Sequence, residues 1–296
     1  MPKKKRIFFT KMQGAGNDYV YIDALGAPTS LIPEEVSLPD LARKISDRHF
    51  GVGGDGLIVI MPSVDADFRM RMFNADGSEA GMCGNASRCV AKYLYDKGFA
   101  DKKCITLETG SGIKILNLEI SDGVTSGVTV DMGKPFMKRG DIPAAGDADE
   151  IMVDHMVEAD SVVFPITGVG MGNPHGVIFV DEITDRHIHH YGRILETAEI
   201  WPEKANIEFV KVLDENHIEM RVWERGTGET LACGTGACAS VVAAHHKGLT
   251  GNAVEVKLLG GTLSIVVDNV SGHVFMQGPA EFVAEGVYDY YPDRKY

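Results

Sequence analysis

The chain has 296 residues, of which 44% are hydrophobic and 24% are charged, and its formal net charge is −13. This composition is typical of globular proteins, the length favours two domains over one core, and the acidic balance argues against a nucleic-acid partner. No apolar run approaches about 18 residues, and only a short apolar stretch follows the basic residues 1–6, so we expect a cytoplasmic protein with neither a signal peptide nor a membrane partner.

The first half of the chain predicts short strands and one long helix. Residues 69–73 alternate apolar and polar side chains, as a half-buried strand does. A polar turn then leads to Cys83-Gly84 and to a helix expected over residues 86–97, which Lys97-Gly98 would terminate. Further strands are expected at residues 57–61, 104–108, 113–120 and 126–131.

The second half repeats this order. Residues 68–98 and 218–248 align at a constant offset of 150 with seven identities in 31 positions, among them Cys83/Cys233 and Gly84/Gly234. The second helix, expected over residues 236–247, is apolar on nearly every side and must therefore be buried. Further strands are expected at residues 162–166, 207–213, 219–223, 254–258, 262–267 and 273–277.

The repeat predicts two α+β domains, each a strongly curved sheet wrapped around one central helix. A second echo supports this division, because the loop Gly14–Asn17 matches Gly170–Asn173 and an apolar run follows each loop. Residues 133–160 are acidic and contain glycine and proline, and we interpret 132–135 as the crossing between the halves.

Five cysteines occur, and their odd number and spacing favour neither a disulfide framework nor a zinc site, since no C-x-x-C pair is present. Cys89 and Cys238 fall inside the expected helices and Cys104 in a strand, so we interpret them as packing residues. The histidines at 187, 189 and 190 lack ligand partners at metal spacing, so no metal site is predicted.

The repeated pair Cys83 and Cys233 predicts acid–base chemistry. A cysteine at a helix start meets the positive end of the helix dipole and free N–H groups, which favour the thiolate and lower its pKa. The following Gly84-Asn85 and Gly234-Thr235 would cradle an anion such as a carboxylate. If the two helix starts faced one substrate, a thiolate could remove an α-hydrogen and a thiol return one to the opposite face, without any cofactor.

Six segments resemble the diaminopimelate epimerase family, in the family's order and across almost the whole chain. They are Lys11–Val20, Arg48–Gly56, Phe73–Glu79, Met82–Asn85, Met171–His175 and Glu224–Ala237. The resemblance implies a pseudosymmetric two-domain fold with mostly antiparallel sheets and a homodimer. It also implies that residues 1–132 with 280–296 carry Cys83, and that residues 133–279 carry Cys233.

The resemblance further implies interconversion of LL- and meso-diaminopimelate in lysine and peptidoglycan biosynthesis. Cys83 and Cys233 would be the acid–base pair, and His175 and Glu224 would adjust their protonation. The remaining substrate-binding positions would be Asn17, Asn74, Gly84, Asn85, Asn173, Asn206, Arg225, Gly234 and Thr235, with Glu224 contributing as well.

One departure from the family pattern leaves the substrate open. Gly56 stands where some members carry a glutamine that contacts substrate, so that contact cannot come from this side chain. Two alternatives therefore remain: a related two-cysteine racemase acting on another amino acid, and a binding protein that keeps the fold without chemistry. Asn85 after Cys83-Gly84 argues against the proline racemase branch, and the presence of both cysteines argues against loss of chemistry.

Overall fold

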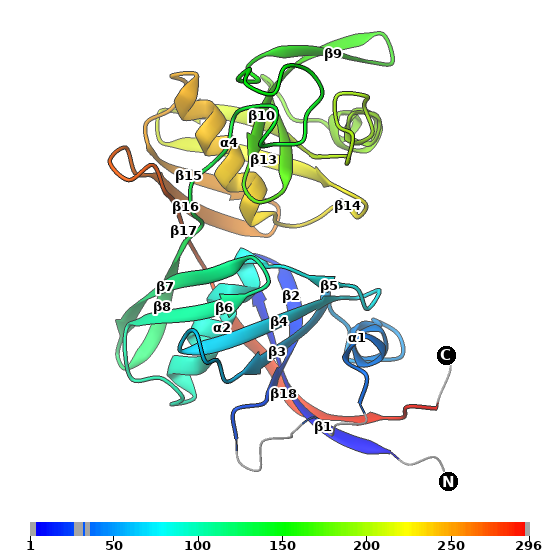
Figure 1. Cartoon of the computed structure of the whole chain (residues 1–296), viewed down its shortest axis with the longest axis vertical. Coiled ribbons are helices and arrows are strands. Elements are labelled where there is room, and N and C mark those ends of the chain that lie inside the picture. Colours follow the sequence, from blue (N-terminus) through cyan, green and yellow to red (C-terminus); the bar gives the residue numbers. More distant parts are fainter. Residues whose placement is uncertain (1–3, 27–31, 33–35, 294–296) are drawn as a thin grey trace. The chain divides into compact units, whose positions relative to one another are not determined.

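The computed structural model describes residues 4–26, 32 and 36–293 (Figure 1). The chain folds into two compact units, Met1–Val130 with Gly278–Tyr296, and Asp131–Gln277. The first three residues of the basic N-terminal run and the last three of the C-terminal tail lie outside the described residues. Among the described residues, no helix has both the length and the apolar character that crossing a membrane requires.

The first unit is a mixed sheet with helices. β1 pairs antiparallel with β18 and β2, β2 pairs parallel with β3, and β3 pairs antiparallel with β4. β4 then pairs parallel with β6, which continues antiparallel into β7 and β8. Its elements are β1 (Lys5–Gly14), β2 (Asn17–Asp23), α1 (Leu38–Ser46), β3 (Gly56–Met61), β4 (Phe68–Asn74), β5 (Glu79–Ala80), α2 (Gly84–Asp96), β6 (Cys104–Thr109), β7 (Gly112–Ser121), β8 (Val124–Asp131) and β18 (Glu281–Tyr290).

The second unit repeats these pairings. β10 pairs antiparallel with β9 and β11, β11 parallel with β12, β12 antiparallel with β13, and β13 parallel with β15. Its elements are β9 (His155–Ala159), β10 (Val162–Gly170), β11 (Pro174–Phe179), η1 (His187–Gly192), α3 (Arg193–Glu196), β12 (Asn206–Asp214), β13 (His217–Glu224), β14 (Gly228–Glu229), α4 (Gly234–His246), β15 (Ala253–Leu258), β16 (Gly261–Val267) and β17 (Val274–Gly278).

The strand registers extend the internal repeat beyond the aligned segments. Tyr19 lies opposite Gly56 in the parallel pair of the first unit, and His175 lies opposite Asn206 in that of the second. The offset of 150 therefore relates β3 to β12 as well as the two helices. The predicted α+β class with two pseudosymmetric halves is confirmed.

Helices α2 and α4 lie against the strands of their own units, drawn in cyan and orange in Figure 1. Both helices begin two residues earlier than the sequence pattern predicted, at Gly84 and Gly234, and both end one residue earlier. The expected burial of α4 is confirmed, since Gly236–Ala244 is buried throughout. The sequence pattern missed the first residues of both helices because a glycine has no apolar side chain that could show the helical period.

Candidate active site

The first cysteine lies at the start of α2. Cys83 is the N-cap residue, with an extended backbone at φ −135° and ψ 124°, and its side chain does not cap the helix. It is half-buried, and its Sγ donates to Oδ1 of Asn17, 3.3 Å away. Nδ2 of Asn85 lies 3.5 Å from the same oxygen. The start of β2 and the first turn of α2 thus meet at the amide oxygen of Asn17, which lies beside the thiol.

Asp55 fixes the orientation of that amide. Nδ2 of Asn17 donates to Oδ2 of Asp55 over 2.7 Å, which leaves Oδ1 to face Cys83. Burial, followed by the nearby charge of Asp18, raises the pKa of the Asp55 carboxyl. Asp55 was not predicted as a site residue, although it lies inside one of the family-like segments.

A buried arginine supports the first turn of α2. Arg88 is completely buried, and one guanidinium nitrogen donates to Oδ1 of Asn85 over 2.8 Å. Its Nε donates to the carbonyl oxygen of Pro279 over 3.2 Å. The chain segment just before β18 is therefore linked to the residue that follows Cys83-Gly84. We name Cys83, Asn17, Asn85 and Asp55 the first cysteine site.

The second cysteine lies at the start of α4 and is more enclosed. Cys233 is the N-cap residue, and it is only 6% exposed. Burial, and then the charges of Glu224 and Glu208, raise the pKa of the Cys233 thiol well above its ordinary value. The expectation that a helix start lowers this pKa is wrong for Cys233, because burial and the charges of two nearby carboxylates disfavour its thiolate.

A buried histidine accompanies Cys233. Nδ1 of His175 lies 2.7 Å from Oε1 of Glu208, and both side chains are completely buried. Nε2 of the same ring lies 2.9 Å from Oδ1 of Asn173. Glu208 was not predicted as a site residue, although a carboxylate within the apolar strand Asn206–Val210 was a signal, since a buried charge requires a partner.

Glu224 and Asn206 complete this part of the second unit. Burial raises the pKa of the Glu224 carboxyl, although the Thr230 hydroxyl donates to it. Asn206 is buried, its Nδ2 donates to the carbonyl oxygen of Pro174, and its Oδ1 accepts from the backbone N–H of Arg225. We name Cys233, His175, Glu208 and Glu224 the second cysteine site.

Other predicted residues have different surroundings. The amide of Asn74 donates to the Ser78 hydroxyl over 3.0 Å within its own turn. Arg225 is exposed and donates to the carbonyl oxygen of Glu203 over 3.3 Å. Thr235 is half-buried, with its hydroxyl 3.5 Å from the sulfur of Cys233, while Gly84 and Gly234 are the buried first residues of their helices.

Gly56 is fixed by backbone packing. A Cβ at this position would lie 2.1 Å from the carbonyl oxygen of Phe73 and 2.9 Å from the ring of Tyr19. Because the first contact involves backbone of the neighbouring strand β4, no larger residue fits without a shift of the sheet. Steric exclusion by the neighbouring strand therefore explains why position 56 holds glycine and not glutamine.

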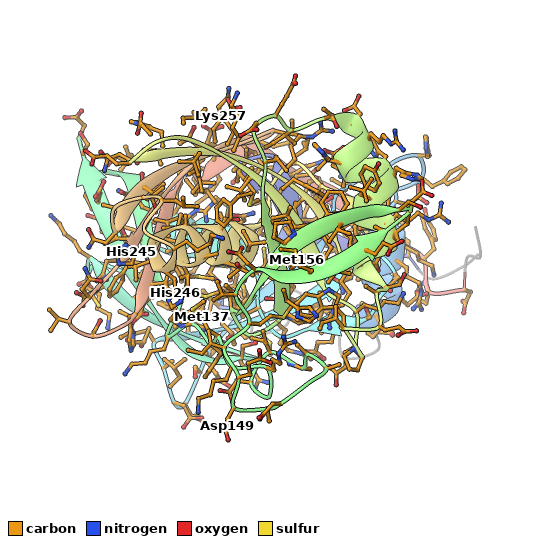
Figure 2. The ribbon with its side chains drawn as sticks, turned by 90° about the horizontal axis from the view of Figure 1, so that it is seen from above. Met137, Asp149, Met156, His245, His246 and Lys257 are labelled. Atoms are coloured by element: carbon orange, nitrogen blue, oxygen red, sulfur yellow. The ribbon has the colours of Figure 1, made fainter. Side chains whose placement is uncertain are left out.

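The remaining histidines do not assemble a metal site. Within residues 4–26, 32 and 36–293, no group of three or more histidine, cysteine or carboxylate side chains could hold a metal ion. Figure 2 labels His245 and His246, which occupy the last turn of α4. His189 and His190 are exposed and lie beside Glu229 and Asp160 respectively.

Comparison with known proteins identifies close relatives over nearly the full chain. The sequence model of the family described as "Diaminopimelate epimerase" matches residues 9–138 and 167–283. A diaminopimelate epimerase of Methanococcus maripaludis is 47% identical over 282 residues, which cover 95% of this chain and 99% of the relative. One from Desulfovibrio desulfuricans is 50% identical over 286 residues, covering 95% of this chain and 97% of the relative.

Solved structures share the fold at low sequence identity. A hydroxyproline epimerase from Agrobacterium vitis, with bound trans-4-hydroxy-L-proline, has a TM-score of 0.71 at 14% identity and covers 99% of this chain and 95% of its own. A PhzF-family phenazine biosynthesis protein from Bacillus anthracis has a TM-score of 0.69 at 20% identity and covers 96% of this chain and 99% of its own. These two likenesses support the fold alone.

Proposed function

The chain belongs to the diaminopimelate epimerase family and is an epimerase, and we propose that it interconverts LL- and meso-2,6-diaminopimelate by proton transfer at Cα between Cys83 and Cys233. One observation carries the proposed mechanism. Each unit holds a cysteine as the N-cap residue of its equivalent helix, a few residues after an equivalent hairpin and directly before a glycine. A reaction that treats the two faces of one carbon alike needs such a pair of equivalent groups.

The helix starts supply the electrostatics of the reaction. The N–H groups of Gly84, Asn85, Gly234 and Thr235 lie in the first turns of α2 and α4, where they have no partner within the helix. We propose that they bind the carboxylate next to the reacting carbon. Neutralising that carboxylate makes the α-hydrogen more acidic, so that a cysteine thiolate can remove it.

Inversion requires the two cysteines to be oppositely protonated. One thiolate removes the α-hydrogen, and the other thiol donates a proton to the opposite face of the planar intermediate. His175 and Glu224 would adjust this balance, since they lie in the second cysteine site. After one turnover the protonation states are exchanged, and the reverse reaction uses the same two groups with their roles exchanged.

The distal amino-carboxylate end of the substrate needs charged and polar partners. We propose that Arg225 binds the distal carboxylate, because a guanidinium can form two parallel bonds to it. The amides that would complete this set are Asn17, Asn74, Asn173 and Asn206. Arg225 is exposed, so its guanidinium is available to bind the distal carboxylate.

We also propose that the protein acts without a cofactor, as a cytoplasmic homodimer, in lysine and peptidoglycan biosynthesis. Two thiols with matched protonation states can perform the whole proton transfer, so no electron sink such as pyridoxal phosphate is needed. Activity of purified protein after exhaustive dialysis against chelator, without added cofactor, tests the first part. Sedimentation of the full chain tests the dimer.

The function is tested by mixing reduced full-length protein with LL-diaminopimelate in D2O. We expect deuterium at Cα together with appearance of the meso isomer. Folded, reduced protein that neither exchanges nor inverts this substrate would contradict the proposal. A panel of free amino acids serves as the control, and faster inversion of proline or another amino acid would transfer the assignment to a related racemase.

A further inference from the structure

Glu208 is a completely buried carboxylate that the proposed mechanism does not use. It lies on β12, which pairs in parallel with β11, and the register places His175 opposite Asn206. Since side chains along a strand alternate between faces, residue 208 lies on the same face as residue 206, diagonal to His175. The contact of 2.7 Å between Glu208 Oε1 and His175 Nδ1 follows from this register.

The first turn of α4 is shaped around the same carboxylate. A Cβ on Gly236 would lie 2.7 Å from Oε1 of Glu208 and 3.3 Å from Sγ of Cys233. The glycine therefore leaves the space that the carboxylate occupies beside the cysteine. At the offset of 150, the residues of the first unit that are equivalent to Glu208 and Gly236 are Ile58 and Ala86, which are both buried and apolar. Carboxylate and glycine in one unit thus correspond to isoleucine and alanine in the other.

The surroundings of Glu208 leave His175 as its main polar partner. Around the carboxylate lie His175 on β11, Glu224 on β13 and Cys233 at the start of α4. Within the described part of the chain, Oε2 of Glu208 has no hydrogen-bond partner. A buried carboxylate oxygen without a partner is costly, so its retention needs a reason other than packing.

We propose that Glu208 is a positioning residue that accepts the Nδ1 hydrogen of His175 and thereby fixes the orientation of the ring, whose opposite nitrogen, Nε2, lies beside the side-chain amide of Asn173. The two ring nitrogens of an imidazole are distinguished by the hydrogen bond that each makes, so a fixed acceptor at Nδ1 also fixes the ring orientation. This inference rests on the proposed function, in which His175 adjusts the protonation of the cysteines.

The test compares the wild-type full-length protein with three variants. Glu208→Gln keeps the shape and an acceptor oxygen but removes the charge. The double variant Glu208→Ile with Gly236→Ala copies the first unit and refills the space that the carboxylate leaves. Glu219→Gln is the matched control, because Glu219 lies on β13 with a partly exposed carboxylate and pairs with Lys257, labelled in Figure 2.

The first readout is the proton resonance of His175 Nδ1–H in 15N-histidine-labelled, substrate-free protein. A buried hydrogen bond to a carboxylate slows exchange of this proton with water and moves its resonance downfield, and His175→Gln assigns the signal by removing it. We expect the signal in wild type and in Glu219→Gln, and its loss in the double variant. Its persistence in the folded double variant would overturn the positioning role, whatever the substrate of the enzyme.

The second readout is epimerisation of diaminopimelate. We expect kcat to fall about 10- to 100-fold in the double variant and less in Glu208→Gln, with KM within about threefold of wild type. Unchanged kcat in a double variant that has lost the resonance would show that the bond does not serve the reaction. Wild-type protein that shows the resonance but inverts no diaminopimelate would instead count against the proposed function.

Discussion

The two cysteine sites share one backbone frame but differ in the groups that surround the sulfur. In the first, Cys83 is half-buried and its sulfur donates to the neutral amide of Asn17. In the second, Cys233 is enclosed, and the carboxylates of Glu224 and Glu208 raise its pKa in addition to burial. The cap position and the glycine are repeated, whereas the neighbouring side chains are not.

This difference teaches that a helix start does not by itself decide the protonation state of a thiol. The strand registers and the offset of 150 make Asn74 equivalent to Glu224, and Ile58 equivalent to Glu208, in the two units. An acid therefore replaces an amide at one position and an apolar side chain at the other. Such unequal surroundings favour different protonation states of the two cysteines, as a reaction that needs one thiol and one thiolate requires.

The comparison predicts, first, that both cysteines are needed despite their different surroundings. Cys83→Ala and Cys233→Ala should each lower kcat by about 10³-fold or more, because either change removes one of two obligatory proton-transfer groups. Epimerisation of LL-diaminopimelate measures the loss, and circular dichroism checks the fold. Cys104→Ala, at an exposed strand position, is the control and should retain activity. Near-normal turnover in either variant would contradict the two-base mechanism.

A smaller effect is expected when the orienting carboxylate of the first cysteine site loses its charge. Asp55→Asn allows the amide of Asn17 to turn, because an amide at position 55 can donate as well as accept. We expect kcat/KM to fall about 10- to 100-fold. Asp65→Asn, at an exposed position ten residues away, should have no effect. Equal activities of the two variants would exclude a role of Asp55 in orienting Asn17.

Gly56→Ala sharpens the comparison at the position equivalent to Asn206. Its Cβ would meet the Phe73 carbonyl oxygen, so the sheet of the first unit must shift, and we expect a loss of about 1–3 kcal/mol in the free energy of unfolding. Urea denaturation measures this loss. Gly123→Ala, in a turn with open space around the glycine, isolates the cost of positive φ alone. If Gly56→Ala were as stable as Gly123→Ala, the sheet would relieve the steric contact with little loss in the free energy of unfolding.

The smallest effect concerns an ion pair that has no equivalent in the second unit, where Pro174 replaces Asp18. Burial acts to raise the pKa of Asp18, but hydrogen bonds and charges from Arg48 and Lys11 outweigh it and hold the pKa below its ordinary value. The ionised carboxylate therefore stabilises the folded state above the unfolded pKa, about 3.9, and this stabilisation is lost as pH falls through the lower folded pKa.

Asp18→Asn should accordingly cost up to about 1 kcal/mol at pH 7, since Arg48 is largely exposed. The difference from wild type should shrink below about pH 4. Denaturant unfolding at pH 7 and pH 3 measures both values. The same difference at both pH values would mean that packing, and not charge, accounts for the effect.

The sequence alone determined the features that depend on local patterns. The period-two alternation of residues 69–73 and 219–223 predicted strands β4 and β13, because alternation follows from the pleat itself. The offset of 150 predicted both long helices and the equivalence of Cys83 and Cys233, since a duplicated unit keeps the glycines and caps that its backbone requires. Helix α1 and the short turns of η1 and α3 were missed, because their periodic stretches are brief.

The tertiary structure decided everything that depends on residues brought together from different strands. Only the parallel pairing of β11 with β12 places Glu208 against His175, and only the fold brings Asp55 to the amide of Asn17. The raised pKa of Cys233 likewise follows from burial and from two carboxylates on separate strands. A sequence pattern specifies which face of an element is apolar, but the charge and solvation at a given atom depend on neighbours that are distant in the chain.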